Sequence, residues 1–317
     1  MTRKIAIIGA LTSFGLALSD CLAAAGWAAN DIYALSPTPK RGIRIPFQNS
    51  FLPILSLETF DFHQVSLAFL CLPAFLSEYK DDILQSGTYL IDCVGILENA
   101  PCIISSLNLK RAKTTHAVSN PTALTVALAR TLAPIHQQFQ ITGAEATIFL
   151  SAGLFGTQAV QDLLNQSRCL YTHEEPQTNF FPKIQAFNLL PNFCPALGRR
   201  TSDQIKSLLH FPMTISTCLT PVFQGECYSV TLTTQRKSTL SQIKKICYEN
   251  TLCRLDESFA PNLGLTTQDI LCGNSVYLSQ LVSVPFRPNT YHLWILCDSL
   301  RNGSVPNAVQ IADYLLS

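Results

Sequence analysis

The chain has 317 residues, of which 47% are hydrophobic and only 14% are charged, and its formal net charge is +1. This length predicts two domains, each with its own hydrophobic core. The neutral balance gives no electrostatic basis for binding nucleic acid or an acidic membrane surface, and no basic cluster with interleaved aromatic residues occurs. Because a chain so poor in charge is expected to bury surface beyond its own core, we expect a homo-oligomer.

The twelve cysteines are scattered along the chain. None forms a Cys-x-x-Cys pair or groups with histidine at zinc spacing, so no metal site is predicted. The six histidines show no pairing that suggests a metal site or a catalytic triad either. We therefore interpret the cysteines as small buried residues in a reducing cytoplasm.

The first 21 residues leave one alternative open. A basic start at Thr2–Lys4, an apolar run to Leu18 and then Cys21 imitate a secretory or lipoprotein signal. Asp20 is not the small residue that such a cleavage site needs, and the segment also fits a strand, a loop and a helix. We prefer the cytoplasmic interpretation, in which no membrane segment is expected, since no other apolar run approaches the ~20 residues of a spanning helix.

The N-terminal elements follow the order of a Rossmann unit. Residues 4–8 predict a strand, 15–25 a helix and 32–35 a second strand. The loop from Gly9 to Gly15 carries glycine at both ends but Thr12 in the middle, where a dinucleotide-binding loop needs the backbone to come close to the pyrophosphate. The hydroxyls of Thr12 and Ser13 could contact a phosphate, but an ordinary turn from strand to helix explains the loop equally well.

Further along, residues 66–72, 89–92 and 114–118 predict strands, and residues 121–138 predict a helix with one apolar stripe. Asn120 is placed as its N-cap and Pro121 as its first residue. The chain therefore turns from a strand straight into a helix N-terminus, where backbone N–H groups and the helix dipole favour an anion.

The C-terminal half mixes strands and helices. Strands are predicted at 141–150, 213–219 with a continuation to 226, 231–234, 276–284 and 293–297, and helices at 158–165 and 241–249.

Several motifs carry a resemblance to one enzyme family. Asn120-Pro121-Thr122-Ala123 is similar to the Asn-Pro-Asn-Cys helix start of aspartate-semialdehyde dehydrogenases, and residues 298–312 resemble that family's C-terminal motif. Residues 151–156 and 185–191 resemble the Usg-type branch, which often lacks the catalytic residues. The resemblance covers nearly the whole chain.

The resemblance implies a fold and a division of the chain. It implies an α/β protein in which residues 1–122 and 303–317 form a Rossmann-like dinucleotide-binding domain. Residues 123–302 would form an α+β dimerisation domain with a mixed sheet. The implied cofactor is NADP, held by residues of the first domain: Gly9, Thr12, Ser13, Gly15 and Ser36.

Two further segments bear on the cofactor. Lys40 and Arg41 match basic residues that lie near the 2′-phosphate in the family, although a solvated turn would look the same. Pro73-Ala74 replaces a Gly-Gly turn that lies against the nicotinamide. NADP binding is therefore expected to be possible but weakened.

The catalytic positions that the resemblance implies carry other residues. Ala123 stands where the family has its nucleophilic cysteine, and Glu226 where it has the histidine that acts as general acid and base. Leu219 and Glu98 stand where the family has arginines for the substrate carboxylate and for phosphate. Cys227 could be imagined as a relocated nucleophile, but we interpret it as a strand residue facing the core.

We therefore expect no catalytic residue at these positions. The leading hypothesis is a catalytically inactive or diverged family member, a dimeric scaffold or interaction protein with an unknown partner and a vestigial nucleotide site. Two alternatives stay open. One is an active NADP-dependent oxidoreductase of amino-acid biosynthesis acting on an aldehyde or acyl phosphate; the other is a nucleotide-sensing binding module.

Overall fold

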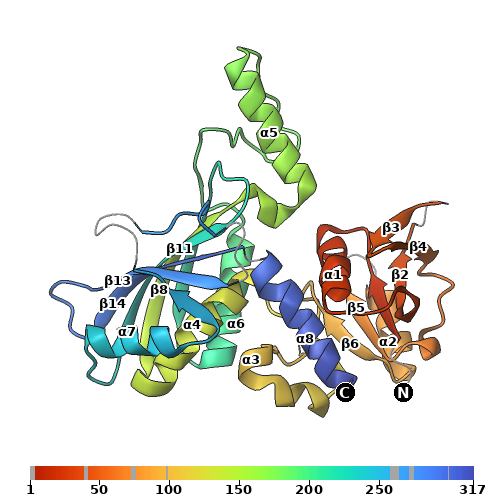
Figure 1. The fold of residues 1–317 in the computed structure, drawn as a ribbon, viewed down its shortest axis with the longest axis horizontal. Coiled ribbons are helices and arrows are strands. Elements are labelled where there is room, and N and C mark those ends of the chain that lie inside the picture. Colours follow the sequence, from red (N-terminus) through yellow and green to blue (C-terminus); the bar gives the residue numbers. More distant parts are fainter. Residues whose placement is uncertain are drawn as a thin grey trace. The chain divides into compact units, whose positions relative to one another are not determined.

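The computed structural model describes residues 4–38, 42–72, 76–97, 99–257, 264–270, 275–298 and 300–317. The chain divides into two compact units (Figure 1). Unit 1 comprises Met1–Ala123 and Gly303–Ser317, and unit 2 comprises Leu124–Asn302. Among the described residues, no helix combines the length and the apolar character that crossing a membrane requires.

Unit 1 is built on a seven-stranded sheet in the order β3-β4-β2-β1-β5-β6-β7. The pairs from β4 to β7 are parallel, and only the edge strand β3 runs antiparallel. The central strands are fully buried because both faces of a parallel sheet are covered. The strands are β1 (Ile5–Ile8), β2 (Ile32–Ser36), β3 (Arg44–Phe47), β4 (Ser50–Ser56), β5 (Leu67–Leu70), β6 (Tyr89–Asp92) and β7 (Ala117–Ser119).

The helices of unit 1 come from both ends of the chain. The C-terminal helix α8 packs against α1 and α3 (Figure 1). The α-helices are α1 (Ser13–Ala24), α2 (Leu76–Gln85), α3 (Ser105–Asn108) and α8 (Val305–Leu315), and the short 3₁₀ turns are η1 (Ala29–Asp31), η2 (Phe62–Gln64) and η3 (Leu109–Thr114). A π-helical turn, η5 (Leu300–Ser304), leads into α8.

Two buried asparagines join α8 to the strand ends. The Asn307 side chain donates to Asn120 Oδ1 at 2.8 Å and to the Ile103 carbonyl at 2.9 Å, and it accepts from Ser105 N at 2.8 Å. Asn120 Nδ2 donates to the Ser304 carbonyl at 2.9 Å. The predicted N-cap role of Asn120 is therefore wrong, because its side chain binds the C-terminal segment, and α4 (Ala123–Phe139) begins three residues later.

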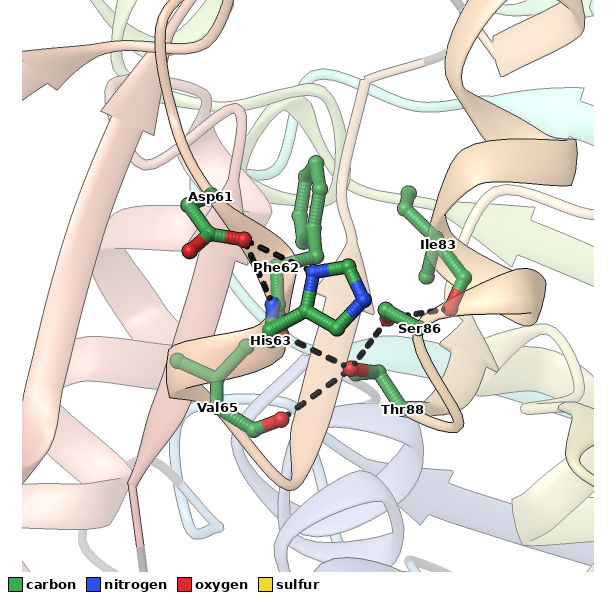
Figure 2. A network of polar contacts seen from close by, with 7 residues as sticks. All are labelled: Asp61, Phe62, His63, Val65, Ile83, Ser86 and Thr88. Carbon is green, nitrogen blue, oxygen red and sulfur yellow. Dashed lines mark hydrogen bonds and ion pairs between the residues drawn. The ribbon is translucent and has the colours of Figure 1, made fainter.

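A network of hydroxyl hydrogen bonds lies just before the N-terminal ends of β5 and β6 in the same sheet (Figure 2). The buried Thr88 hydroxyl lies 3.0 Å from the carbonyls of Phe62 and Val65 and 2.8 Å from the hydroxyl of Ser86. Asp61 caps η2 by accepting from the backbone N–H of His63. Most of these contacts tie a side chain to a loop backbone, so we interpret this network as structural.

Unit 2 is built on a second seven-stranded sheet in the order β12-β13-β14-β11-β8-β10-β9. The pairs β8–β10 and β12–β13 are parallel and the others are antiparallel, so the sheet is mixed. The strands are β8 (Ile141–Leu150), β9 (Leu190–Pro191), β10 (Met213–Leu219), β11 (Glu226–Thr234), β12 (Cys253–Leu255), β13 (Val276–Ser283) and β14 (Thr290–Cys297).

Helix α6 packs against β10, and α7 packs against β12 and β13. Helix α5 projects away from this sheet (Figure 1). The helices of unit 2 are α4, which begins at the unit boundary, α5 (Thr157–Tyr171), α6 (Pro195–Leu209), α7 (Leu240–Glu249) and the 3₁₀ turn η4 (Ala152–Phe155).

The predicted fold class, a Rossmann-like domain followed by an α+β domain with a mixed sheet, is confirmed. Several local features differ, and helix α2 and strand β12 are among the elements that were not predicted. The hairpin β3–β4 and helix α6 were not predicted, and the strand expected to continue from Leu219 to Glu226 is instead broken, with β11 starting at Glu226. Gly225 explains this break because its φ of +88° suits a turn rather than a strand.

Candidate functional site

The loop between β1 and α1 keeps its shape through Thr12. Its hydroxyl donates to the Gly9 carbonyl at 2.8 Å and accepts from Gly15 N at 3.0 Å, so Thr12 is the N-cap of α1. With φ of −71° and ψ of 160°, Thr12 has ordinary extended backbone and needs no glycine. The middle position of the loop thus stabilises the turn, but it also occupies one N–H group that could face a phosphate.

The two retained glycines have distinct structural reasons. Gly9 has φ of +86°, a left-handed conformation that favours glycine. A Cβ on Gly15 would lie 2.4 Å from the Gly9 carbonyl oxygen, so glycine is what lets α1 approach β1. This turn fits the start of a dinucleotide site, while the inward hydroxyl of Thr12 does not fit close contact with a pyrophosphate.

The other predicted cofactor residues lie at the same sheet edge. Ser36 ends β2 beside Gly9, and its Oγ accepts from Thr38 N at 3.4 Å. Ser13 is exposed at the start of α1. The basic pair Lys40 and Arg41, the Pro73-Ala74 turn and Glu98 lie outside the described residues.

The first residue of α4 is Ala123, which carries a methyl group at the position where the resembled family has its nucleophilic cysteine. Ala123 is half-buried, and the backbone of Gly303 packs against it: a Cβ on Gly303 would lie 3.0 Å from the Ala123 carbonyl oxygen. The helix tip is therefore closely covered, within unit 1, by the segment that precedes α8. An alanine here supplies no thiolate, hydroxyl or amine for covalent chemistry.

Leu219 and Glu226 come together within unit 2. The strand register places one row of residues across the ends of neighbouring strands: Leu190, Leu219, Leu150, Glu226 and Cys297. Every member of this row is buried, so the row belongs to the covered face of the sheet. Leu219 and Glu226 flank Leu150, and in this apolar row the carboxylate of Glu226 is the one ionisable oxygen group.

Ser151 binds Glu226 directly. The Ser151 hydroxyl donates to Glu226 Oε1 at 2.7 Å, and the two side chains are 1% and 2% exposed. Ser151 follows β8 and Glu226 begins β11, so the bond joins two strand ends. A carboxylate held this way could accept a proton, but at this burial the serine serves it as a hydrogen-bond donor rather than as a nucleophile.

Gln185 adds an unsatisfied acceptor to unit 2. Its Nε2 donates to the Thr220 carbonyl at 2.6 Å, and its backbone N–H donates to Gln166 Oε1 at 2.7 Å. Its Oε1, on a fully buried side chain, has no donor among the described residues. Leaving a buried carbonyl of this kind unpaired costs about 1–3 kcal/mol.

Cys227 lies in β11, but it does not face the core as predicted. Burial alternates along this strand, so Glu226 and Tyr228 face the core and Cys227 lies half-buried on the opposite face. Burial raises the pKa of Cys227 to about 12. At pH 7 its thiol is therefore protonated, which excludes it as a ready nucleophile.

Two comparisons find full-length relatives. The chain is 27% identical to an aspartate-semialdehyde dehydrogenase of Rickettsia bellii (strain RML369-C) over 334 residues, which covers 100% of this chain and 99% of the relative. It is 27% identical to a USG-1 protein homolog of Azotobacter vinelandii, with 98% and 97% covered. No family model matches the chain.

Solved structures agree over the whole fold. A probable aspartate-semialdehyde dehydrogenase from Pseudomonas aeruginosa superposes with a TM-score of 0.90 at 26% identity, covering 99% of this chain and 98% of that one. Over its whole length the chain is similar to aspartate-semialdehyde dehydrogenases. A Candida albicans aspartate-semialdehyde dehydrogenase solved with NADP shares the fold at a TM-score of 0.76 and 10% identity, covering 100% and 99% of the two chains.

Sequence reasoning based on the resemblance to aspartate-semialdehyde dehydrogenases did not identify two polar side chains of this region as candidate site residues. Ser151 and Gln185 were recognised only as parts of Usg-type motifs, yet Ser151 binds Glu226 and Gln185 binds the segment after Leu219. A signal for Ser151 was available, because antiparallel pairing of β8 with β11 places the residue after Leu150 near Glu226. The contacts of Gln185 depend on how residues 172–189 fold, and the sequence contains no comparable signal for them.

Proposed function

We propose that this chain is a catalytically diverged aspartate-semialdehyde dehydrogenase homologue that serves as a dimeric scaffold or interaction protein. The observation that carries the proposal is Ala123 at the start of α4, where the family pattern places a cysteine. Glu226, engaged by Ser151, and Leu219, in an apolar row, support it. By analogy with other covalent enzymes, losing the nucleophile alone costs on the order of 10⁴- to 10⁶-fold in rate.

A turnover assay tests this proposal. The purified chain is mixed at high concentration with aspartate semialdehyde, NADP and phosphate, and NADPH formation is followed beside an active enzyme of the family. We expect no phosphate-dependent rate above the background without protein. A saturable, phosphate-dependent rate would support the alternative of a working oxidoreductase of amino-acid biosynthesis and would overturn the proposal.

NADP binding belongs to the same proposal. The glycines of the β1–α1 loop favour a residual nucleotide site, while the hydroxyl of Thr12 already occupies the N–H of Gly15. When bound, NADP would accept a hydride. The residues that would hold it are Gly9, Ser13, Gly15 and Ser36, and Thr12 would limit how closely its pyrophosphate comes to the loop backbone. Titration with NADPH followed by fluorescence separates a scaffold, which gives no saturable signal, from a nucleotide sensor.

Replacing Thr12 by glycine is expected to strengthen NADPH binding about tenfold, because one additional N–H bond to a charged phosphate is worth roughly 1.5 kcal/mol. The helix cap would lose only a few tenths of a kcal/mol. Thr12→Ala separates the two causes, because it frees the same N–H but keeps a Cβ: a gain equal to that of Thr12→Gly assigns the limit to the hydroxyl, and no gain assigns it to the Cβ. Equal affinity of Thr12→Gly and the unmodified chain would show that Thr12 does not limit the site.

The homodimer would form through unit 2. The face of its sheet that is opposite the core carries half-buried side chains, among them Phe149 and Trp294, whose rings stack 6.0 Å apart. Tyr171 at the end of α5 and Phe187 beyond it add exposed aromatic surface: their rings contact each other, and the residues are 76% and 67% exposed. Such aromatic surface is typical of the centre of an interface.

Sedimentation equilibrium measures this assembly. We expect a dimer mass for the unmodified chain and a monomer mass for Trp294→Glu. A monomer at every concentration of the unmodified chain would remove the dimer from the proposal. A cytoplasmic location stays a prediction.

A further inference from the structure

Two cysteines lie side by side at the carboxyl edge of the unit 1 sheet. Leu70 of β5 pairs with Asp92 of β6, and the next residue of each strand is a cysteine, Cys71 and Cys93. The ladder continues through both, because Cys71 N donates to the Ile8 carbonyl at 2.8 Å and Cys93 N to the Leu70 carbonyl at 3.0 Å. The two residues are therefore direct neighbours in register.

This placement satisfies the geometry of a disulfide. Neighbouring strands lie about 4.8 Å apart, which falls inside the Cα separation of about 4.4–6.8 Å that disulfides span. Residues in one row of a sheet project to the same face, and the neighbouring Cys71 thiol raises the pKa of Cys93. In the reduced chain the Cys93 thiol donates to the Ile91 carbonyl at 3.8 Å. Cys102 is not part of this pair: it bridges to Ser119, in the adjacent row whose side chains point to the other face.

We propose that Cys71 and Cys93 are a dithiol that hydroperoxides oxidise reversibly to an intramolecular disulfide. Cys93 is the more accessible of the two, since Cys71 is buried and Cys93 half-buried. Its thiolate attacks the peroxide oxygen, which forms a sulfenic acid and releases an alcohol, or water when the oxidant is hydrogen peroxide. The Cys71 thiolate then attacks the sulfenic sulfur and displaces hydroxide, which leaves as water. Two thiols lose two protons and two electrons, and one peroxide bond is reduced.

The third member of the row gives the oxidation a structural consequence. Asn120 follows β7 in register with Cys93, and its side chain acts to lower the pKa of that thiol. Asn120 also holds Ser304 and Asn307. Closing the disulfide draws the sulfur of Cys93 toward β5 and away from this amide. Oxidation would thus act on the anchor of α8 and on the sheet edge that carries the β1–α1 loop.

The titratable groups that face Cys93 set its reactivity. Burial, the neighbouring Cys71 thiol and the carboxylate of Asp92 all raise the pKa of Cys93 well above the usual thiol range. Only the thiolate reacts with peroxide. As long as the pH is below the pKa, the thiolate fraction rises tenfold for each unit by which the pH increases. Like Cys227, Cys93 is therefore protonated at pH 7 and reacts slowly there, and the oxidation rate is expected to rise about tenfold per unit from pH 7 to 9.

The test is peroxide titration of the full chain at several pH values, with free thiols alkylated afterwards in denaturant and peptides mapped by mass spectrometry. We expect one cross-linked peptide pair, Cys71 to Cys93, that dithiothreitol reverses. Cys71→Ser is expected to abolish it and leave a sulfenic acid on Cys93 that dimedone traps, while Cys102→Ser leaves the cross-link unchanged.

The mapping on the unmodified chain does not depend on any variant folding. Failure of the 71–93 cross-link to form while the chain stays folded would overturn the proposal. So would oxidation of Cys71 and Cys93 to separate sulfinic acids, or a rate that does not change with pH.

Discussion

Gly15→Ala is expected to destabilise unit 1 by about 3 kcal/mol. An added Cβ would lie 2.4 Å from the Gly9 carbonyl oxygen and 2.8 Å from Ala10 Cα, both backbone atoms that cannot rotate away. Alanine is otherwise the better helix former by about 1 kcal/mol, so a loss of stability isolates the contact between α1 and β1. A loss of this size is a large fraction of the 5–15 kcal/mol that typically holds a domain together.

The two tryptophans of the chain make the measurement specific to one unit. Trp27 lies in unit 1 and Trp294 in unit 2, so urea unfolding in a Trp294→Phe background reports on unit 1 through Trp27 fluorescence. Gly143→Ala is the control, read through Trp294 in a Trp27→Phe background, because the atom closest to its added Cβ is a carbonyl oxygen 3.9 Å away. If Gly15→Ala unfolded at the same urea concentration as its parent, the close approach would not constrain this position.

Asn307→Ala is expected to cost at least about 3 kcal/mol in the same assay. It would leave three groups without their partner: the backbone N–H of Ser105, the carbonyl of Ile103 and Oδ1 of Asn120. Leaving a buried polar group unpaired costs about 1–3 kcal/mol each. The variant is also expected to loosen α8, which increased hydrogen exchange of its amides would show.

Gln310→Ala on the same helix is the matched control for Asn307. Gln310 is exposed and accepts one hydrogen bond from the Ser105 hydroxyl, so its loss is expected to change stability by no more than about 0.5 kcal/mol. Equal effects of the two variants would mean that the buried network does not anchor the C-terminal helix.

The sequence predicts most of the fold because its periodicity is strong where elements are buried. The strand 141–150 and the strand from 213 to 219 were predicted at their observed bounds, and the β1–α1–β2 unit within two residues at each end. The hairpin β3–β4 was missed because it lies at an exposed sheet edge, where Pro46 and Pro53 interrupt the pattern. Helix α6 was missed because Gly198 and several charged residues obscure its narrow apolar face.

The candidate site was less predictable than the fold. A motif comparison identifies Ala123, Leu219 and Glu226 as replaced positions, but it says nothing of what the replacing residues contact. Glu226 binds Ser151, 75 residues away in sequence, and Asn120 binds Asn307 across 187 residues. Thr12 illustrates the limit: the sequence raised it as an obstacle to a phosphate, and only its hydrogen bond from Gly15 N reveals that it caps α1.

The most direct test of the account is a search for a covalent intermediate. With aspartate semialdehyde and NADP present and phosphate withheld, an enzyme that uses a thiolate would retain the acyl group as a thioester, which intact-protein mass spectrometry detects. We predict an unmodified mass for this chain and an adduct on a reference enzyme of the family. An acyl adduct mapped to any cysteine of this chain, above all to Cys93 beside Asn120, would contradict the claim that the chain has lost its nucleophile.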